Sequence, residues 1–131
     1  MRFFLLFICV ATAINGCEKG GINPSNLTGK WELRHYSGTI AGVSKDLPAG
    51  NGTMLQFNAD STYKHFTDFK QDNQGSYHIS PKGVLFGGVR YDGISFDDRT
   101  TKDFIVLKAD SLTIGNTFPD GVTSLYIRKS N

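Results

Sequence analysis

Three histidines and one pair of adjacent acidic residues are the side chains most able to carry out proton or metal chemistry in this sequence. His35, His65 and His78 are far apart in the chain, and no HxxH, CxxC or His-x-Glu spacing supplies a further ligand. Metal sites need three or four converging ligands, so we expect no metal site. Asp97 and Asp98 are consecutive, and neighbouring strand residues point to opposite faces, so we interpret the pair as part of a solvated turn.

The motifs that mark enzymes and nucleic-acid-binding proteins are absent from the sequence. There is no Gly-x-Ser-x-Gly elbow, and the four glycines between residues 83 and 93 do not match a phosphate-binding loop, which requires a helix directly after it. Fourteen Lys and Arg against twelve Asp and Glu give a formal net charge of +2, without the basic stripe that nucleic-acid binding needs. We therefore expect no catalytic residue, no cofactor and no nucleic-acid partner.

One cysteine has a sequence context that predicts a covalent lipid anchor. Residues 3–14 form an apolar run of twelve residues with one polar member. Crossing a bilayer takes about 20 helical residues, whereas the apolar part of a signal peptide takes about 7–15. Ile14-Asn15-Gly16-Cys17 resembles the bacterial lipobox, whose Cys is acylated and becomes the first residue of the mature chain. The alternative is an ordinary secretory signal in which Cys17 is incidental.

Lipidation at Cys17 would divide the chain into three parts. Residues 1–16 are expected to be a cleaved signal peptide, residues 17–28 the lipidated Cys and a flexible tether, and residues 29–131 one folded domain. Cys9 would leave with the signal peptide and Cys17 would carry acyl chains, so no disulfide is expected. Two or three acyl chains hold a protein durably on a membrane. The membrane is therefore the partner that the N-terminus predicts.

From residue 29 onward the apolar pattern predicts strands and turns. No stretch of ten residues shows the i, i+3, i+4, i+7 apolar spacing of a helix, and glycines recur too often for helices. Turn residues separate nine apolar or aromatic runs, at residues 30–36, 53–57, 62–69, 76–79, 83–91, 93–96, 103–108, 112–115 and 122–129. We expect an all-β domain, an eight-stranded antiparallel up-and-down barrel, because closure removes exposed strand edges.

Two turns and two loops punctuate this pattern. Residues 58–61 and 108–111 both contain Ala-Asp-Ser, which predicts tight hairpins in which the Asp side chain accepts a backbone hydrogen bond from two residues further on. Residues 37–52 and 117–121 carry Gly and Pro and are predicted to be loops. The hairpins would fix the register of the strands that they join.

Side chains at alternate strand positions share one face, and in each strand one of the two faces is more apolar. We place that face inward, and by the same parity His78 faces outward. Aromatic walls with a few polar groups are typical of pockets for small apolar molecules. The predicted ligand-binding set is Trp31, Leu33, Leu55, Phe57, Tyr63 and Tyr77, with His35 and His65 as its polar members.

The start of the domain resembles a known family. Residues 27–33 carry the Gly-x-Trp of lipocalins, and residues 55–63 and 75–77 extend a similarity to the lipocalin-like domain of small Gram-negative lipoproteins, particularly of Bacteroidetes. The resemblance implies a calycin-like barrel, a small apolar ligand and the cell envelope of a Gram-negative bacterium. The residue directly after Cys17 is Glu18 and not Asp, which disfavours retention in the inner membrane, so we expect the outer membrane, on its periplasmic side or its surface. In lipocalins a C-terminal Arg lies across the Trp, and Arg128 is the matching residue; an exposed Arg128 on the outer face is the alternative. The structural residues that the resemblance implies are Gly29, Trp31 and Arg128.

Two functional interpretations remain open. One is a membrane-anchored envelope lipoprotein whose barrel binds a small apolar ligand. The other is a non-catalytic interaction or structural module whose barrel is filled by its own side chains, because an eight-stranded barrel can do either and thirteen aromatic residues follow residue 16. A connected apolar cavity would favour the first interpretation, and a packed lumen with an apolar patch outside would favour a protein partner.

Replacing Cys17 by Ser tests the lipid anchor. A hydroxyl cannot form the thioether that holds the acyl chains, so Cys17→Ser is expected to lose all incorporated palmitate. Metabolic labelling with an alkynyl palmitate provides the measurement. Cys9→Ser lies in the expected signal peptide and is the matched control, which should keep the label. Palmitate retained on Cys17→Ser would contradict the lipoprotein interpretation.

Overall fold

The structure is a computed structural model that describes residues 21–38 and 41–130, a part of the chain with one short helix and nine strands. The expected signal peptide, residues 1–16, and Cys17 lie outside the described residues. The elements are α1 (Pro24–Leu27), β1 (Gly29–Gly38), β2 (Val43–Asp46), β3 (Met54–Phe57), β4 (Thr62–Thr67), β5 (Lys70–Phe86), β6 (Val89–Phe96), β7 (Asp103–Lys108), β8 (Ser111–Gly115) and β9 (Thr123–Arg128). Within the described residues, no helix is long and apolar enough to cross a membrane.

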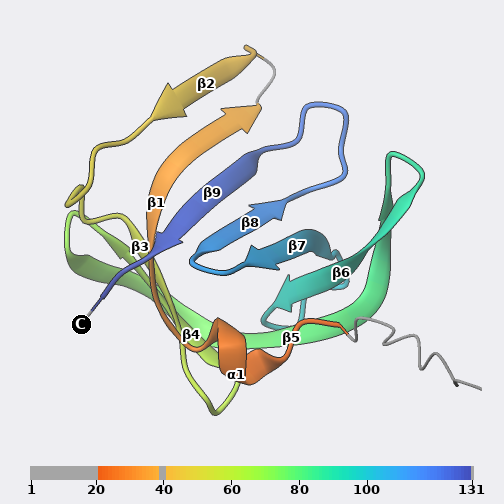
Figure 1. The fold of residues 1–131 in the computed structure, drawn as a ribbon, viewed down its shortest axis with the longest axis horizontal. Helices are drawn as coiled ribbons and strands as arrows, with labels where there is room; N and C mark the ends of the chain where they lie inside the picture. Colours follow the sequence, from red (N-terminus) through yellow and green to blue (C-terminus); the bar gives the residue numbers. More distant parts are fainter. Residues whose placement is uncertain (1–20, 39–40, 131) are drawn as a thin grey trace, which may run out of the picture.

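Eight of the strands form a closed antiparallel barrel. Neighbouring strands pair in the order β1-β3-β4-β5-β6-β7-β8-β9, and β9 pairs back with β1 (Figure 1). From β3 onward each strand pairs with the next one along the chain, which is the up-and-down arrangement. The all-β, eight-stranded barrel predicted from the sequence is therefore confirmed.

The ninth strand, β2, continues the path of β3 along the same edge of β1. β3 pairs with Gly29–Glu32 of β1, and β2 pairs with His35–Gly38. Both run antiparallel to β1, so they are two parts of one strand path interrupted by residues 47–53. The prediction that residues 37–52 form a loop is therefore wrong for residues 37–38, which end β1, and for residues 43–46. β2 contains one apolar residue and is exposed throughout. It is a strand because it pairs with β1, and its sequence has no apolar pattern that would have predicted this.

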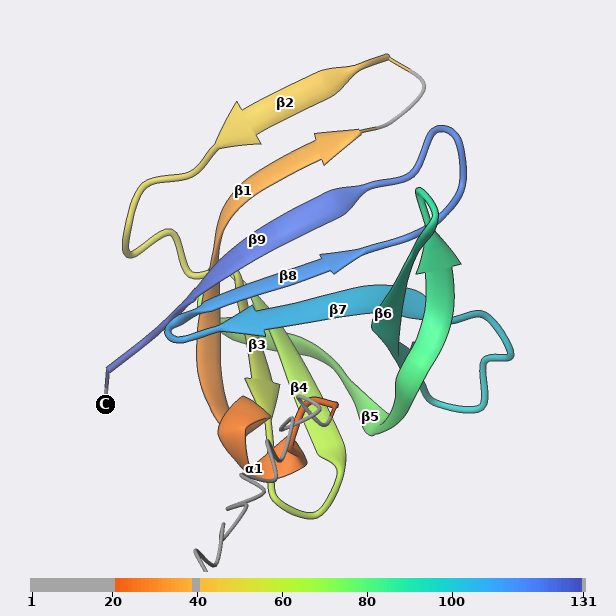
Figure 2. The ribbon, with the colours of Figure 1, turned by 45° about the vertical axis from the view of Figure 1, so that its right-hand side comes forward.

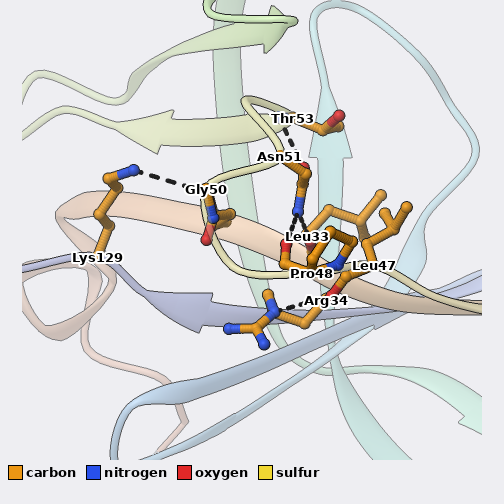
Figure 3. Close-up of polar contacts among 9 residues, drawn as sticks. Leu33, Arg34, Leu47, Pro48, Gly50, Asn51, Thr53 and Lys129 are labelled. Carbon is orange, nitrogen blue, oxygen red and sulfur yellow. Dashed lines mark hydrogen bonds and ion pairs between the residues drawn. The ribbon is translucent and has the colours of Figure 1, made fainter.

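The interrupting loop, residues 47–53, is tied to the middle of β1. The side-chain amide of Asn51 donates to the carbonyl oxygen of Leu33 at 2.8 Å, as Figure 3 shows. The guanidinium of Arg34 donates to the carbonyl oxygen of Leu47 at 3.1 Å. β1 has a β-bulge at the same place, where its register with β9 shifts between Leu33 and His35. The loop thus follows the bend that the bulge introduces.

A buried acid lies beneath this loop. Glu32 accepts a hydrogen bond from the backbone N–H of Gly50 at 3.0 Å, and its carboxylate lies 3.6 Å from Nζ of Lys129. A buried charge is costly unless it is paired and hydrogen-bonded, and Glu32 has both kinds of partner. The loop and the C-terminal end of the chain therefore meet on one side chain of β1.

β5 is long enough to pair with two neighbours in succession. Its residues 70–76 pair with β4, and its residues 77–86 pair with β6. The sequence predicted separate strands over residues 76–79 and 83–91, and the second of these is wrong because the chain reverses at Gly87 and Gly88. Both glycines have positive φ, 57° and 78°. A Gly-Gly pair is a strong signal for a two-residue hairpin turn, and here it interrupts the apolar run.

The hairpins predicted between β3 and β4 and between β7 and β8 are confirmed, but their two Asp residues act differently. Asp60 accepts a hydrogen bond from the backbone N–H of Thr62 at 3.1 Å, as predicted, and its bonds from Thr62 lower the pKa of Asp60. Asp110 instead faces Arg128, with 3.3 Å between Oδ1 and Nε. The second carboxylate therefore contributes to the seam between β1 and β9.

Aromatic and aliphatic side chains fill one end of the barrel. The rings of Phe57 and Tyr77 meet edge to face with centroids 4.9 Å apart, and Phe96 stacks on Phe57 at 6.3 Å. Phe96 is partly buried, and the fully buried side chains of this cluster are Leu27, Trp31, Phe57, Ile94, Ile105 and Leu112. This packing replaces a disulfide as the source of stability in the described domain.

The segment before the barrel closes that end. α1 places Leu27 in the core, where it is fully buried, and the indole Nε1–H of Trp31 donates to the Leu27 carbonyl oxygen at 2.8 Å. The backbone N–H of Ile22 donates to the carboxylate of Asp92 on β6 at 2.6 Å. The expected flexible tether over residues 17–28 is therefore wrong for residues 22–28, which belong to the folded domain.

Arg128 joins the helix, the first strand and the last strand. Its guanidinium lies 4.1 Å from the ring centroid of Trp31, which confirms the expected pairing and rejects an Arg128 exposed on the outer face. The same group donates to the carbonyl oxygens of Thr28 at 3.0 Å and Asn26 at 2.7 Å. A planar guanidinium can stack flat on the ring and donate two hydrogen bonds in the fork geometry at the same time, whereas a Lys ammonium lacks this planar shape.

Replacing Arg128 by Lys is expected to lower the free energy of unfolding by about 1–3 kcal/mol. A stacked guanidinium contributes about 0.5–2 kcal/mol and each hydrogen bond from a charged donor about 1.5–3 kcal/mol, of which Lys can retain part. Urea unfolding followed by circular dichroism measures the change. Arg90→Lys on β6, where the side chain is exposed, is the matched control and should stay within about 0.5 kcal/mol. Equal stability of the two variants would contradict the assigned role.

Candidate ligand-binding cavity

The barrel interior is not filled along its whole length. A cavity of about 320 Å³ opens where the loops after β6 and β8 leave the barrel. Figures 1 and 2 place the β8–β9 loop and α1 at opposite ends of the molecule, so the cavity opens away from the closed end. The cavity wall includes the apolar side chains of Leu55, Phe96, Ile114 and Val122 and the polar side chains of Tyr63, His65, Asn73, Asn116, Ser124 and Tyr126.

A hydrogen-bonded chain holds one side of the cavity wall. The side-chain amide of Asn73 donates to Oη of Tyr63 at 3.3 Å, and the Tyr63 hydroxyl donates to Asp97 at 3.1 Å. Asp97 also accepts from the backbone N–H of Ser76 at 3.1 Å. Burial and then the neighbouring Asp97 raise the pKa of Tyr63, so its hydroxyl stays a donor across the physiological range.

One glycine makes this chain of contacts possible. A Cβ on Gly75 would collide with the Asp97 carboxylate and would lie 3.0 Å from the Tyr63 ring. Asp97 lies in the turn after β6 and is exposed, as the sequence analysis expected, with a positive φ of 56°. Its carboxylate additionally positions the tyrosine, a role that the interpretation as a solvated turn did not include.

His65 stands at the edge of the cavity in a fixed orientation. Its Nδ1 lies 2.6 Å from Oδ1 of Asp72, and the Thr67 hydroxyl donates to Oδ2 of the same carboxylate at 2.6 Å. The bond from Thr67, followed by the one from His65, lowers the pKa of Asp72. With Nδ1 engaged, the ring has Nε2 to offer to a molecule in the cavity.

Two side chains of opposite charge line the cavity at the β6–β7 loop. Arg99 is exposed and belongs to that loop, whereas Asp103 is the first residue of β7 and is half-buried. Burial raises the pKa of Asp103, and the charge of Arg99 lowers it to a smaller extent. The cavity therefore combines an apolar wall with polar and charged groups.

Of the eight residues predicted to bind a ligand, the structure brings three to the cavity: Leu55, Tyr63 and His65. Trp31, Phe57 and Tyr77 face inward but belong to the packed core cluster, and they do not line the cavity. The inclusion of these three residues in the predicted ligand-binding set is therefore wrong for this cavity. Leu33 pairs with Tyr126 and shares its face, but it too is outside the lining.

His35 does not face the lumen, which corrects the prediction made from parity. The bulge shifts the register so that His35 pairs with Leu125, which lies between the cavity-lining residues Ser124 and Tyr126. Because strand side chains alternate, Leu125 and His35 point to the outer face. There Nδ1 of His35 lies 2.6 Å from Oδ1 of Asp46 on β2.

The cavity contains residues that the sequence analysis did not select. Ser124 and Tyr126 lie in the predicted run 122–129, and extending the alternation argument to that run would have found them. Arg99 and Asn116 lie on loops, where no periodicity indicates a direction. In the part of the chain that the structure describes, no group of three His, Cys, Asp or Glu side chains is close enough to hold a metal ion.

Comparisons of the chain with protein-family models, with curated proteins and with solved structures give no match. The functional assignment consequently depends on the geometry of the cavity and on the N-terminal sequence.

Replacing Asp103 by Asn is expected to stabilise the domain increasingly as the pH rises. The pKa of Asp103 is raised in the folded domain. The folded domain therefore holds the proton of this carboxyl more tightly than the unfolded chain does, in which an Asp carboxyl titrates at about 3.9. Below that pH the carboxyl is neutral in both states and contributes nothing. As the pH rises through the folded pKa, the buried charge costs stability in the wild type and not in the variant. Urea unfolding across this pH range measures the difference.

The control for this measurement is Asp98→Asn, which removes the same charge from an exposed neighbour in the β6–β7 loop. A difference between Asp103→Asn and the wild type that shrinks with rising pH would contradict the assigned desolvation.

Proposed function

We propose that the protein is a lipoprotein of the cell envelope, anchored through Cys17, whose barrel binds a small amphipathic molecule in the cavity. The observation that carries the binding proposal is a cavity of about 320 Å³ in a barrel whose other end is filled. Ligand pockets have volumes of about 300–1,000 Å³, so the site suits a small molecule. A barrel that served purely as a filled scaffold would have no need of this space.

The distribution of groups favours a molecule with an apolar body and a polar end. Leu55, Phe96 and Ile114 supply apolar surface, and its burial would provide most of the affinity. At the same cavity His65 offers Nε2 as a hydrogen-bond acceptor and Arg99 offers N–H donors, which would orient the polar end. The proposal therefore narrows the expected ligand from a fully apolar molecule to an amphipathic one.

The anchoring proposal is supported by the sequence before residue 18 and by the position of Gly21. Gly21 lies near Pro81 and Asp92, with contacts of 3.1 Å to an added Cβ. The acyl chains on Cys17 would be attached only four residues away.

A cavity-filling substitution tests the binding proposal. Ser124 lines the cavity, whereas its neighbour Leu125 points to the outer face. With a dansylated fatty acid as the fluorescent probe, we expect saturable binding to the wild type. Ser124→Phe should weaken it by at least about tenfold, because the ring occupies space that the probe needs. Leu125→Phe adds a similar ring outside and should bind like the wild type.

Displacement of the probe by fatty acids, retinoid-like and porphyrin-like compounds then ranks ligand classes. No saturable binding by any of them, or equal binding by both variants, would contradict the proposed site.

A further inference from the structure

The β5–β6 hairpin ends in an apolar tip that the barrel does not cover. Leu85, Phe86 and Val89 are 59%, 43% and 51% exposed, and they flank the turn at Gly87 and Gly88. A Cβ at either glycine would meet nothing within 4 Å. Figure 2 shows this hairpin standing up beside the barrel. Exposed apolar clusters of this kind mark interaction surfaces.

The hairpin stands apart because β6 leaves its neighbour early. β6 and β7 pair over three residue pairs, from Asp92–Ile105 to Ile94–Asp103, and the strands separate beyond them. The ring of Phe86 stacks on Phe104 of β7 with centroids 5.2 Å apart and planes at 13°. This contact braces the hairpin against the barrel, so the tip is held in position.

Basic side chains lie along and beside the hairpin. Lys82 and Arg90 are exposed on the hairpin, and Arg90 pairs directly with Leu85. Lys108 of β7 is exposed beside Phe86 in the groove under the hairpin. The acid closest in sequence, Asp92, already accepts from the backbone N–H groups of Ile22 and Lys82. An apolar tip with basic flanks matches the apolar interior and anionic surface of a bilayer.

Gly21 and Ile22 lie at the base of the same hairpin. Ile22 is bound to Asp92, which lies four residues from Gly88 at the tip, a strand length of about 13 Å. Cys17 lies four residues from Gly21, a reach of at most about 14 Å. The acyl chains and the hairpin tip can therefore reach one membrane surface.

We propose that the tip of the β5–β6 hairpin inserts into the membrane surface and orients the barrel on it. This contact goes beyond the proposed anchor and ligand site. The length argument depends on the proposed acylation of Cys17, whereas the insertion depends on the residues of the tip. A barrel fixed by two contacts would present its cavity in one direction.

Vesicle binding by a chain without acyl groups tests the insertion separately from the anchor. Residues 18–131 suffice, since the barrel closes and buries its core within residues 22–128. We expect them to co-sediment with vesicles of phosphatidylethanolamine and phosphatidylglycerol. The triple variant Leu85→Ser, Phe86→Ser, Val89→Ser should partition at least about tenfold more weakly.

The matched control is Phe69→Ser, which removes an apolar side chain that is 60% exposed on the β4–β5 turn. Figure 1 places that turn on the opposite side of the molecule from the hairpin tip. Phe69→Ser should bind vesicles like the wild type, and circular dichroism checks that every variant is folded.

A second probe reports depth. Leu85→Trp adds an indole at the tip, and vesicles with brominated acyl chains should quench its emission, while the fully buried Trp31 and a Phe69→Trp control should stay unquenched. Absence of vesicle binding, equal binding by the triple variant, or an unquenched Leu85→Trp would each overturn the insertion. A tip required only for a protein partner would produce the first of these outcomes. The palmitate labelling of the Cys17→Ser variant is a separate measurement, and its result bears on the anchor alone.

Discussion

The pairing of the first strand with the last is the constraint on which the rest of this structure depends. β1 has to meet β9 along its length, and Arg128 holds the seam by stacking on Trp31 and binding the carbonyl oxygens of Asn26 and Thr28. The guanidinium of Arg128 is in direct contact with the fully buried ring of Trp31. It therefore contributes more to the free energy of folding than a solvent-exposed charge pair does. Closure in turn encloses the lumen of the barrel.

That inside is divided between packing and binding. α1 and Leu27 close one end, where aromatic rings fill the lumen. At the other end the strands continue into loops, and the cavity lies between side chains that include Ser124, Ile114 and Tyr63. The same barrel therefore holds both the packed core and the proposed binding site. Larger side chains at the open end would add packing contacts and remove the space for a ligand.

The irregular elements of the barrel are where it departs from a simple meander. The bulge in β1 turns His35 outward and lets β2 pair with the outer half of the strand. The early separation of β6 from β7 releases the hairpin that carries Leu85 and Phe86. Bulges and unpaired strand ends are common places for functional surfaces, and here they create a surface distinct from the cavity.

Local patterns in the sequence determined the strand class, the hairpin at residues 58–61 and the inward faces of Leu55 and Tyr63, because each depends on alternation or on a short motif. The pairing of Trp31 with Arg128 was implied by the resemblance to lipocalins, since alternation within one strand does not place Arg128. Tertiary structure alone decided three other features. The bulge reversed the parity of His35, pairing with β1 made β2 a strand, and barrel closure brought Arg99 and Asn116 to the cavity from separate loops. Periodicity specifies which side chains share a face within one strand, whereas register shifts and loop paths depend on contacts between residues distant in the chain.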